Sequence, residues 1–340
     1  MNDLLHNEKL TEWIANATGR QNVRVVRELS GGNSNLTMLV SSDSGDMVLR
    51  TPPQATISPN AHRGIERESR VMRALEGHLK VPAVLAWCDD ASITGHPFLV
   101  VEKIDGISIT DQMPDAYPRD AAAINSLGEQ LTDELAAMHR IDPESVGLAD
   151  FGNPTDFLAR NIDRWQRIRE QDSVRDLPLF GELAAWMRAN APATSLSRLI
   201  HGDYHLDNTL CSPLEPKLLA VIDWELATLG DPLSDLGLFL MFWGPRTIDP
   251  PAFAHVQAVT RIDGVVSRRA LAERWEQATG ISIENLNFYL CFAFWRLAAI
   301  VEGAWILNTR GKVDTAYARG LEYTVPALLH EAKDAANGNW

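Results

Sequence analysis

Three polar residues between positions 200 and 237 have the types and spacing of a divalent-cation site. Asn208 follows Asp203 by five residues, and Asp223 lies near the end of the apolar run LLAVIDW. The short β-prone runs that flank SPLEPK are expected to form a hairpin, which would bring Asn208 and Asp223 to one mouth. Mg²⁺ prefers oxygen ligands and usually takes one or two carboxylates together with phosphate groups. Two carboxylates and a carboxamide at this mouth therefore suit a hard divalent cation such as Mg²⁺.

The loop around Asp203 has a second property. The spacing His201-x-Asp203-x-x-x-x-Asn208 matches that of kinase catalytic loops. Together with IDWE and the later Asp235, it resembles the aminoglycoside phosphotransferase-like family of small-molecule kinases, while a chance run of loop polars is the competing interpretation. The resemblance implies that Asp203 orients and deprotonates an acceptor hydroxyl, and that Asn208 and Asp223 hold Mg²⁺ against ATP phosphates. It also implies that His201 and Asp235 brace the loop.

The resemblance can be tested on the nucleotide-binding parts of the amino-terminal third. Arg50, in MVLRTPP, occupies the position where kinases usually carry a phosphate-bridging lysine, in a chain with only six lysines against 25 arginines. Arginine can pair with phosphate and with a helix carboxylate. Glu68, in IERESRVMRAL, is the expected partner and Glu66 is the alternative. Candidate phosphate contacts also lie in a glycine-containing turn, for which an ordinary hairpin is the other interpretation: Gly31, Gly32, Asn33, Ser34 and Asn35.

Residues 98–106, FLVVEKIDG, resemble the hinge of the same family, where backbone groups meet adenine. Glu102 and Ile104 are the candidate contacts there. An edge strand followed by a turn is the alternative. The composition changes directly after this segment, which supports the hinge.

The elements that must position these residues divide into a β-rich and a helical part. We expect an amino-terminal helix at 4–18, followed by an antiparallel meander of three strands at 23–29, 36–42 and 47–51. A second helix is expected at 65–75, and two further strands at 83–88 and 98–102. Helices then dominate, at 120–139, 155–170, 180–190 and from 234 onward, around the small hairpin. We therefore predict an α+β, bilobal protein-kinase-like fold with an N-lobe at 1–103 and a C-lobe at 104–340.

Charge and composition exclude several classes of partner. The net charge of −14 argues against nucleic acid or an anionic membrane surface as a partner. Three separated cysteines give neither a disulfide framework nor a metal cluster, and the charged N-terminus is no secretory signal. The apolar run 288–307 contains Arg296 and Glu302, which favours a buried core helix over a membrane span; one interpretation pairs these two residues. A cytoplasmic protein is expected.

The acceptor class is the most open question. The C-terminal third resembles most the branch of the family whose kinase-like domains are joined to acyl-CoA dehydrogenases, which implies an ATP-dependent phosphotransferase acting on a hydroxyl of a hydroxy acid or hydroxyacyl-CoA. An aminoglycoside or macrolide antibiotic kinase and an inactive nucleotide-binding regulator are the alternatives. Arg160, Arg164 and Arg167 recur on one helical face, which could bind an anionic acceptor or simply be solvated.

Overall fold

The computed structural model describes residues 2–29, 35–53, 59–172, 174–193, 196–245, 251–253 and 256–340. The chain divides into two compact units. The first contains Met1–Gly106 and Leu219–Ala227, and the second contains Ile107–Leu218 and Thr228–Trp340. The segment Leu219–Ala227, which carries Asp223, therefore groups with the first unit although the sequence prediction placed it in the C-lobe.

The first unit is built on an antiparallel sheet of five strands in the order β1-β2-β3-β5-β4. The strands are β1 (Arg24–Glu28), β2 (Leu36–Ser41), β3 (Met47–Thr51), β4 (Val84–Cys88) and β5 (Phe98–Glu102). In β3 the side chains alternate between buried and half-buried, as expected of a strand with one face on the core. Arg50 lies opposite Thr37 on β2 and Leu99 on β5, so a central strand fixes its position.

Short and long helices complete the first unit: α1 (Asn2–Leu5), α2 (Glu8–Thr18), α3 (Pro59–Leu75) and α4 (Ala91–Thr94). Helix α2 begins where the Asn7 side chain accepts a hydrogen bond from the Leu10 N–H and ends at Gly19, whose φ of +68° suits a left-handed cap. The core contains Leu10, Met38 and Leu49, each fully buried. Helix α3 starts at Pro59, earlier than the predicted residue 65.

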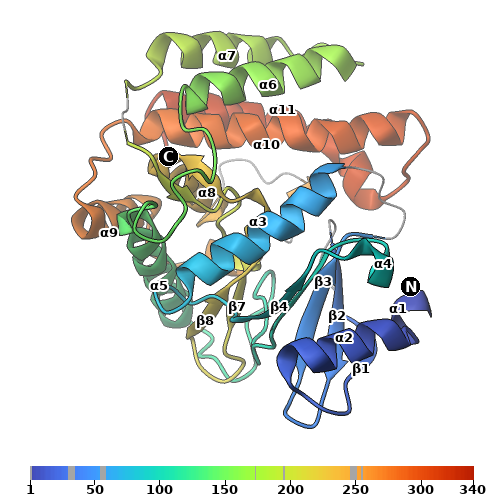
Figure 1. Ribbon diagram of the computed structural model, residues 1–340. Helices are drawn as coiled ribbons and strands as arrows, with labels where there is room; N and C mark the ends of the chain where they lie inside the picture. The colour runs from blue at the N-terminus through green and yellow to red at the C-terminus, as the bar shows by residue number, and fades with distance from the viewer. Residues whose placement is uncertain are drawn as a thin grey trace. The chain divides into compact units, whose positions relative to one another are not determined.

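The second unit is mainly helical, and α6 and α7 lie over α10 and α11 (Figure 1). Its helices are α5 (Ala121–Arg140), α6 (Phe157–Asp172), α7 (Pro178–Asn190), α8 (Pro232–Phe242), α9 (Arg268–Thr279), α10 (Leu286–Thr309) and α11 (Ala316–Ala336). Helix α8 begins at Pro232, with the Asp231 side chain accepting from the Leu233 N–H. Proline is well suited to this first helical position because its missing N–H would have no partner there.

Helix α10 is long and apolar enough to cross a membrane by length and composition alone. In this structure 61% of its most apolar stretch is buried within the protein. The Trp295 indole N–H donates to the Phe180 carbonyl at 3.0 Å, and the Tyr289 hydroxyl donates to Asp231 Oδ2 at 2.6 Å. These contacts show the packing of a core helix, as the sequence predicted.

Short strands frame the loop that contains Asp203. Strand β6 (Arg198–Ile200) precedes it and pairs antiparallel with β9 (Thr228–Gly230), an element that the sequence analysis did not predict. Strand β7 (Thr209–Cys211) follows it and leads into a turn closed by the Ser212 N–H donating to the Lys217 carbonyl at 2.9 Å. Strand β8 (Leu218–Val221) begins directly after this turn.

Candidate active site

The first half of the candidate site is a cluster around Arg50 in the first unit. Arg50 Nε lies 3.1 Å from Glu68 Oε1, and Arg50 Nη2 donates to Asp223 Oδ1 at 2.9 Å. The Glu68 side chain is only 1% exposed and that of Arg50 only 14%. Glu68 rather than Glu66 is thus the partner of Arg50, and the arginine joins strand β3, helix α3 and the segment containing Asp223.

Burial and charge act in opposite directions on this pair. Burial raises the pKa of Glu68 from 4.5 to about 7; Arg50 opposes this, while Asp223 and Glu225 reinforce it. Burial alone would lower the pKa of Arg50, but Glu68 and Asp223 raise it above its ordinary value. One guanidinium therefore contacts both Glu68 and Asp223, and the charge of Glu225 acts on the same guanidinium.

A hard divalent cation prefers oxygen ligands, and the carboxylate of Asp223 can supply them. Asp223 has a φ of +69°, a conformation uncommon for residues other than glycine, and Arg50 contacts only its Oδ1. Glu68 Oε2 is buried and has no hydrogen-bond partner in the part of the chain that the structure describes. Glu225, which the sequence analysis did not select, accepts a hydrogen bond from Asn35 Nδ2 at 2.9 Å and stands two residues after Asp223 in the same IDWE run. The described residues contain no group of three or more His, Cys, Asp or Glu arranged to hold a metal.

The two other predicted nucleotide-contact segments of the first unit have different outcomes. Gly31, Gly32, Asn33 and Ser34 lie outside the described residues, and Asn35 is buried. Glu102 ends β5, and its N–H donates to the Ala83 carbonyl at 2.9 Å, so the sheet already uses that donor. Ile104 lies just beyond the strand. The contact of this segment with adenine stays a prediction.

The second half of the candidate site is the loop after β6. The His201 and Gly202 N–H groups donate to the two oxygens of Asp235, at 2.5 and 2.9 Å. Asp235 is 1% exposed and lies on α8, so its buried carboxylate ties the loop to a core helix. Behind it, His139 Nε2 lies 3.6 Å from Asp235 Oδ2, while His139 Nδ1 accepts from the Trp275 indole at 3.1 Å. The loop is thus braced through its backbone.

Asp203 is held by its own loop. Asn208 Nδ2 donates to the Asp203 carbonyl and to Asp203 Oδ2, both at 2.8 Å, and His205 Nε2 lies 3.5 Å from Asp203 Oδ1. Burial alone would raise the pKa of Asp203, but the hydrogen bond and charge of His205, the charge of His201 and the hydrogen bond from Asn208 lower it to about 2. The carboxylate is therefore ionised and oriented at neutral pH.

Asn208 is oriented by the same contacts. Because its amide nitrogen faces Asp203, its amide oxygen makes no hydrogen bond among the described residues and could ligate a metal. Asn208 belongs to the second unit and Asp223 to the first. Their expected meeting at one metal ion stays a prediction.

The interpretation that Arg296 pairs with Glu302 is wrong. Arg296 Nη2 donates to the Gly202 carbonyl at 2.9 Å, next to Asp203. Glu302 instead binds Arg175, at 2.5 and 3.1 Å, with Arg169 Nε at 3.9 Å. Residues 296 and 302 are six apart, which places them on different faces of α10. Neither set of partners has a local signal in the sequence, because the partners come from distant segments.

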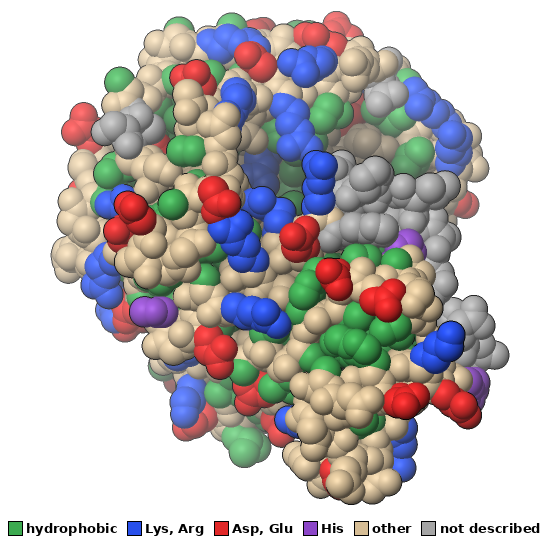
Figure 2. Space-filling view, viewed as in Figure 1, with side chains coloured by type: hydrophobic (Ala, Val, Ile, Leu, Met, Phe, Trp, Pro, Cys, Tyr) green, Lys and Arg blue, Asp and Glu red, His purple; other side chains and the backbone are tan. Residues whose placement is uncertain are grey.

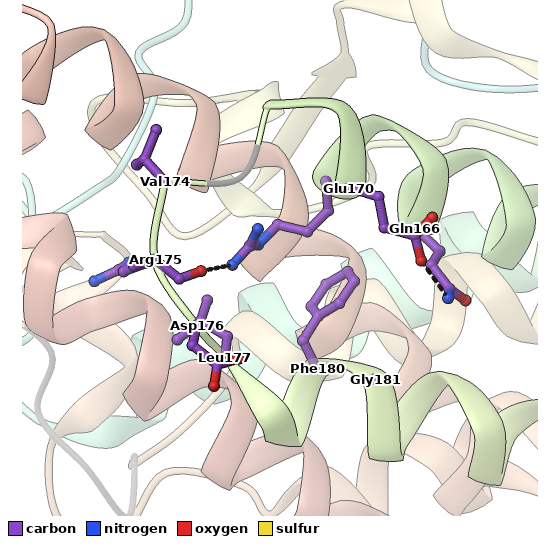
Figure 3. A pocket seen from close by; sticks show the side chains of 9 residues that line it. Gln166, Glu170, Val174, Arg175, Asp176, Leu177, Phe180 and Gly181 are labelled. Carbon is purple, nitrogen blue, oxygen red and sulfur yellow. Dashed lines mark hydrogen bonds between the residues drawn. The ribbon is translucent and has the colours of Figure 1, made fainter.

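A cavity of about 570 Å³ lies beside the Glu302 group, between the end of α6 and the start of α7 (Figure 3). Arg169 Nη2 donates to the Arg175 carbonyl at 2.6 Å at its wall. The lining mixes charged, polar and apolar residues: Gln166, Arg169, Glu170, Val174, Arg175, Asp176, Leu177, Phe180 and Gly181. It contains none of the predicted site residues.

Comparison with known proteins assigns the family. The model of the phosphotransferase enzyme family matches residues 25–271. The chain belongs to this family. As a member of the phosphotransferase enzyme family, the chain is an enzyme, and the predicted kinase-like fold is confirmed by the solved structures that it resembles.

A candidate aminoglycoside phosphotransferase from Ralstonia eutropha is 30% identical, with a TM-score of 0.83 over 97% of this chain and 98% of that one. Two more distant structures share the fold: aminoglycoside 2'-phosphotransferase-IIIa with GDP (18% identical, TM-score 0.62, covering 98% and 99%), and an APH(2")-IIa complex with streptomycin and ATP (16%, 0.58, covering 92% and 98%).

Among curated proteins, mouse acyl-CoA dehydrogenase family member 10 is 33% identical over 292 residues, which are 85% of this chain and 27% of that protein. The human acyl-CoA dehydrogenase family member 11 is 30% identical over 84% of this chain and 36% of its own length. This phosphotransferase chain thus spans about a third of the length of such relatives.

Proposed function

We propose that this phosphotransferase transfers the γ-phosphoryl group of ATP to a hydroxyl of a hydroxy acid or hydroxyacyl-CoA, with Mg²⁺ as its metal ion. The observation that carries the proposal is the Asp203 carboxylate, which Asn208 and His205 orient on a loop braced by Asp235. A fixed, ionised carboxylate of this kind can accept a hydrogen bond from an acceptor hydroxyl and aim its oxygen.

The reaction would proceed by in-line displacement. The acceptor oxygen forms a bond to the γ-phosphorus while the bond from that phosphorus to the β–γ bridging oxygen breaks, and ADP leaves with the electron pair. The hydroxyl proton passes to Asp203 and then to water. A carboxylate with a pKa of about 2 is a weak base, so Asp203 acts mainly by orienting the hydroxyl and accepts the proton late.

The groups expected at the phosphates have suitable chemistry. Mg²⁺, when bound, supplies positive charge against the phosphate oxygens, and Asn208 and Asp223 would hold it. The contact of Arg50 with Asp223 Oδ1 supports this proposal because the second carboxylate oxygen, Oδ2, can serve as a metal ligand. The ATP complex of a structural neighbour supports a nucleotide as donor.

The choice of acceptor rests on the relatives. The name of mouse acyl-CoA dehydrogenase family member 10 refers to acyl-CoA chemistry, and this chain matches a part of that protein. A hydroxyl on an acyl group would be a compatible substrate for a phosphotransferase in the same polypeptide. The antibiotic phosphotransferases share the fold at lower identity and give the competing acceptor class.

Transfer from γ-labelled ATP with Mg²⁺ tests the proposal directly. The acceptors are hydroxy acids, their CoA thioesters, an aminoglycoside and a macrolide, and the matched controls are the same acids and thioesters without the hydroxyl. Labelled product from a hydroxylated acid or thioester alone is expected. Transfer only to an antibiotic would replace the acceptor class, and nucleotide binding without any transfer would contradict catalysis.

A further inference from the structure

Arg296 places a positive charge beside the catalytic loop. Its Nη2 is fixed on the Gly202 carbonyl at 2.9 Å, and the attraction of Asp203 reaches its guanidinium. Burial has the largest effect on the pKa of Arg296 and lowers it; the charges of Asp203 and Asp235 raise it, and the charge of Arg164 lowers it. The guanidinium groups of Arg164 and Arg296 therefore lie close enough to act on one another.

Arg164 lies on α6, which packs along α10, the helix of Arg296. The register follows from the contact of Arg169 on α6 with Glu302 on α10 at 3.9 Å. Arg164 precedes Arg169 by five residues, which is about 7.5 Å along α6, and Arg296 precedes Glu302 by six residues, which is about 9 Å along α10. Arg164 and Arg296 therefore lie at corresponding levels of the two helices. On the face in Figure 2, Lys and Arg side chains lie over and beside α6, with Asp and Glu side chains among them.

Neither arginine forms a salt bridge among the described residues, although the charges of Asp203 and Asp235 act on Arg296. Arg296 makes one hydrogen bond, to a carbonyl, and Arg164 lies over the Trp165 ring with its guanidinium carbon 5.3 Å from the centroid. Arg169 and Arg175, farther along the same helices, share the carboxylate of Glu302. The contrast matters because a chain with a net charge of −14 has carboxylates in excess.

We propose that Arg164 and Arg296 form a recognition site for an anionic group of the acceptor, a carboxylate or a phosphate, beside Asp203. This inference rests on the proposed function and assigns acceptor selection to two named residues. Guanidinium groups bind carboxylates and phosphates through charge-assisted hydrogen bonds. Arg296 is pinned and only partly accessible, whereas Arg164 is exposed, so Arg164 supplies the adaptable part of the site.

Kinetics with charged and neutral acceptors test the proposal. Wild type, Arg164→Gln and Arg164→Glu are compared on a hydroxy acid, its methyl ester and its CoA thioester. The control is Arg119→Gln, which removes an exposed arginine of the same unit paired with Asp115. Arg164→Gln is expected to raise the acceptor KM about tenfold, the worth of one charge-assisted hydrogen bond, for the anionic acceptor only. The KM for ATP and the ester kinetics should change less than twofold.

The comparison of acceptors identifies the source of the anion. If Arg164→Gln raises the KM for the free acid alone, the site binds a carboxylate. If it raises the KM for the thioester alone, the site binds a CoA phosphate. Arg164→Glu should lower activity on the anionic acceptor further than Arg164→Gln does. The control Arg119→Gln should keep activity near that of wild type. Equal loss on acid and ester, together with slower hydrolysis of ATP without acceptor, would show that the arginines serve the transferred phosphoryl group and would overturn the proposal.

Equilibrium binding separates this inference from the proposed function. Binding of the acid without its hydroxyl is measured by calorimetry on wild type and Arg164→Gln. About tenfold weaker binding by the variant supports the anion site even if wild type phosphorylates none of the acceptors. Equal binding by both proteins, or improved binding of an amino sugar by wild type relative to Arg164→Glu, would contradict it.

Discussion

The buried carboxylate of Glu68 makes the stability of this protein depend on pH in a way that Glu68→Gln should remove. Burial raises the pKa of Glu68 from 4.5 to about 7 in the folded protein, so the folded state binds more protons than the unfolded state between these values. The stabilising contribution of this group is fully present below pH 4.5 and is lost as pH rises through about 7.

The size of the effect follows from the same values. One pH unit corresponds to about 1.4 kcal/mol, so the loss between pH 4.5 and pH 7 is about 3 kcal/mol. The pKa of about 7 already includes the opposing effect of Arg50, whose Nε lies 3.1 Å from Glu68 Oε1. The effect persists because Asp223 and Glu225 add negative charge around the same cation.

Urea unfolding from pH 5 to pH 8, without nucleotide or divalent cation, measures this contribution. The free energy of unfolding of wild type relative to Glu68→Gln should fall by between 2 and about 3 kcal/mol across this range. Glu66→Gln, a substitution on the exposed face of the same helix, is the matched control. Its free energy of unfolding should change with pH as that of wild type does. A difference that is flat, or that grows with pH, would show that Arg50 outweighs burial and would refute the reasoning.

Three further predictions concern the second unit. Asp203→Asn should lower transfer about 10³-fold while ATP affinity stays within twofold by calorimetry, because the substitution removes the hydroxyl-orienting charge; unchanged turnover would exclude Asp203 from the chemistry. His205→Asn should raise the carboxyl pKa of Asp203, seen by NMR as a higher midpoint than about 2, since a hydrogen bond and a charge are lost. Glu302→Gln should lower the free energy of unfolding by about 3 kcal/mol in urea, because Arg175 and Arg169 lose a buried carboxylate; a change under 1 kcal/mol would contradict this.

The parts of the fold and site that local sequence defines were predictable. Strand β3 shows its alternation within five residues, and the loop from His201 to Asn208 is one continuous run, so its internal contacts depend on spacing alone. The pairing of Arg50 with Glu68 was expected from the resemblance to kinases, in which a strand residue pairs with a helix carboxylate, and the structure selects Glu68 over Glu66.

Contacts between distant segments were not predictable in this way. Arg296 meets the Gly202 carbonyl 94 positions away, and Glu302 meets Arg175 across 127 positions. Strand β9 has only three residues, too few for any periodic pattern, and it is defined by its pairing with β6. The sequence analysis placed segment 219–227 in the C-lobe, whereas in the structure it groups with the first unit. Tertiary packing, rather than composition, decides where such a short segment belongs.

Local charge balance, rather than net charge, indicates what each half of this enzyme binds. In the first unit, Arg50 contacts Glu68 and Oδ1 of Asp223, and the second oxygen of Asp223 would suit a metal ion. In the second unit, Arg296 lies beside the catalytic loop and feels the charge of the exposed Arg164, and these two guanidinium groups would suit an anion. A total of −14 shows neither of these local arrangements. A phosphotransferase selective for an anionic acceptor needs both: oxygen ligands for a metal ion and, beside its orienting carboxylate, cations that hold the acceptor against the repulsion of Asp203.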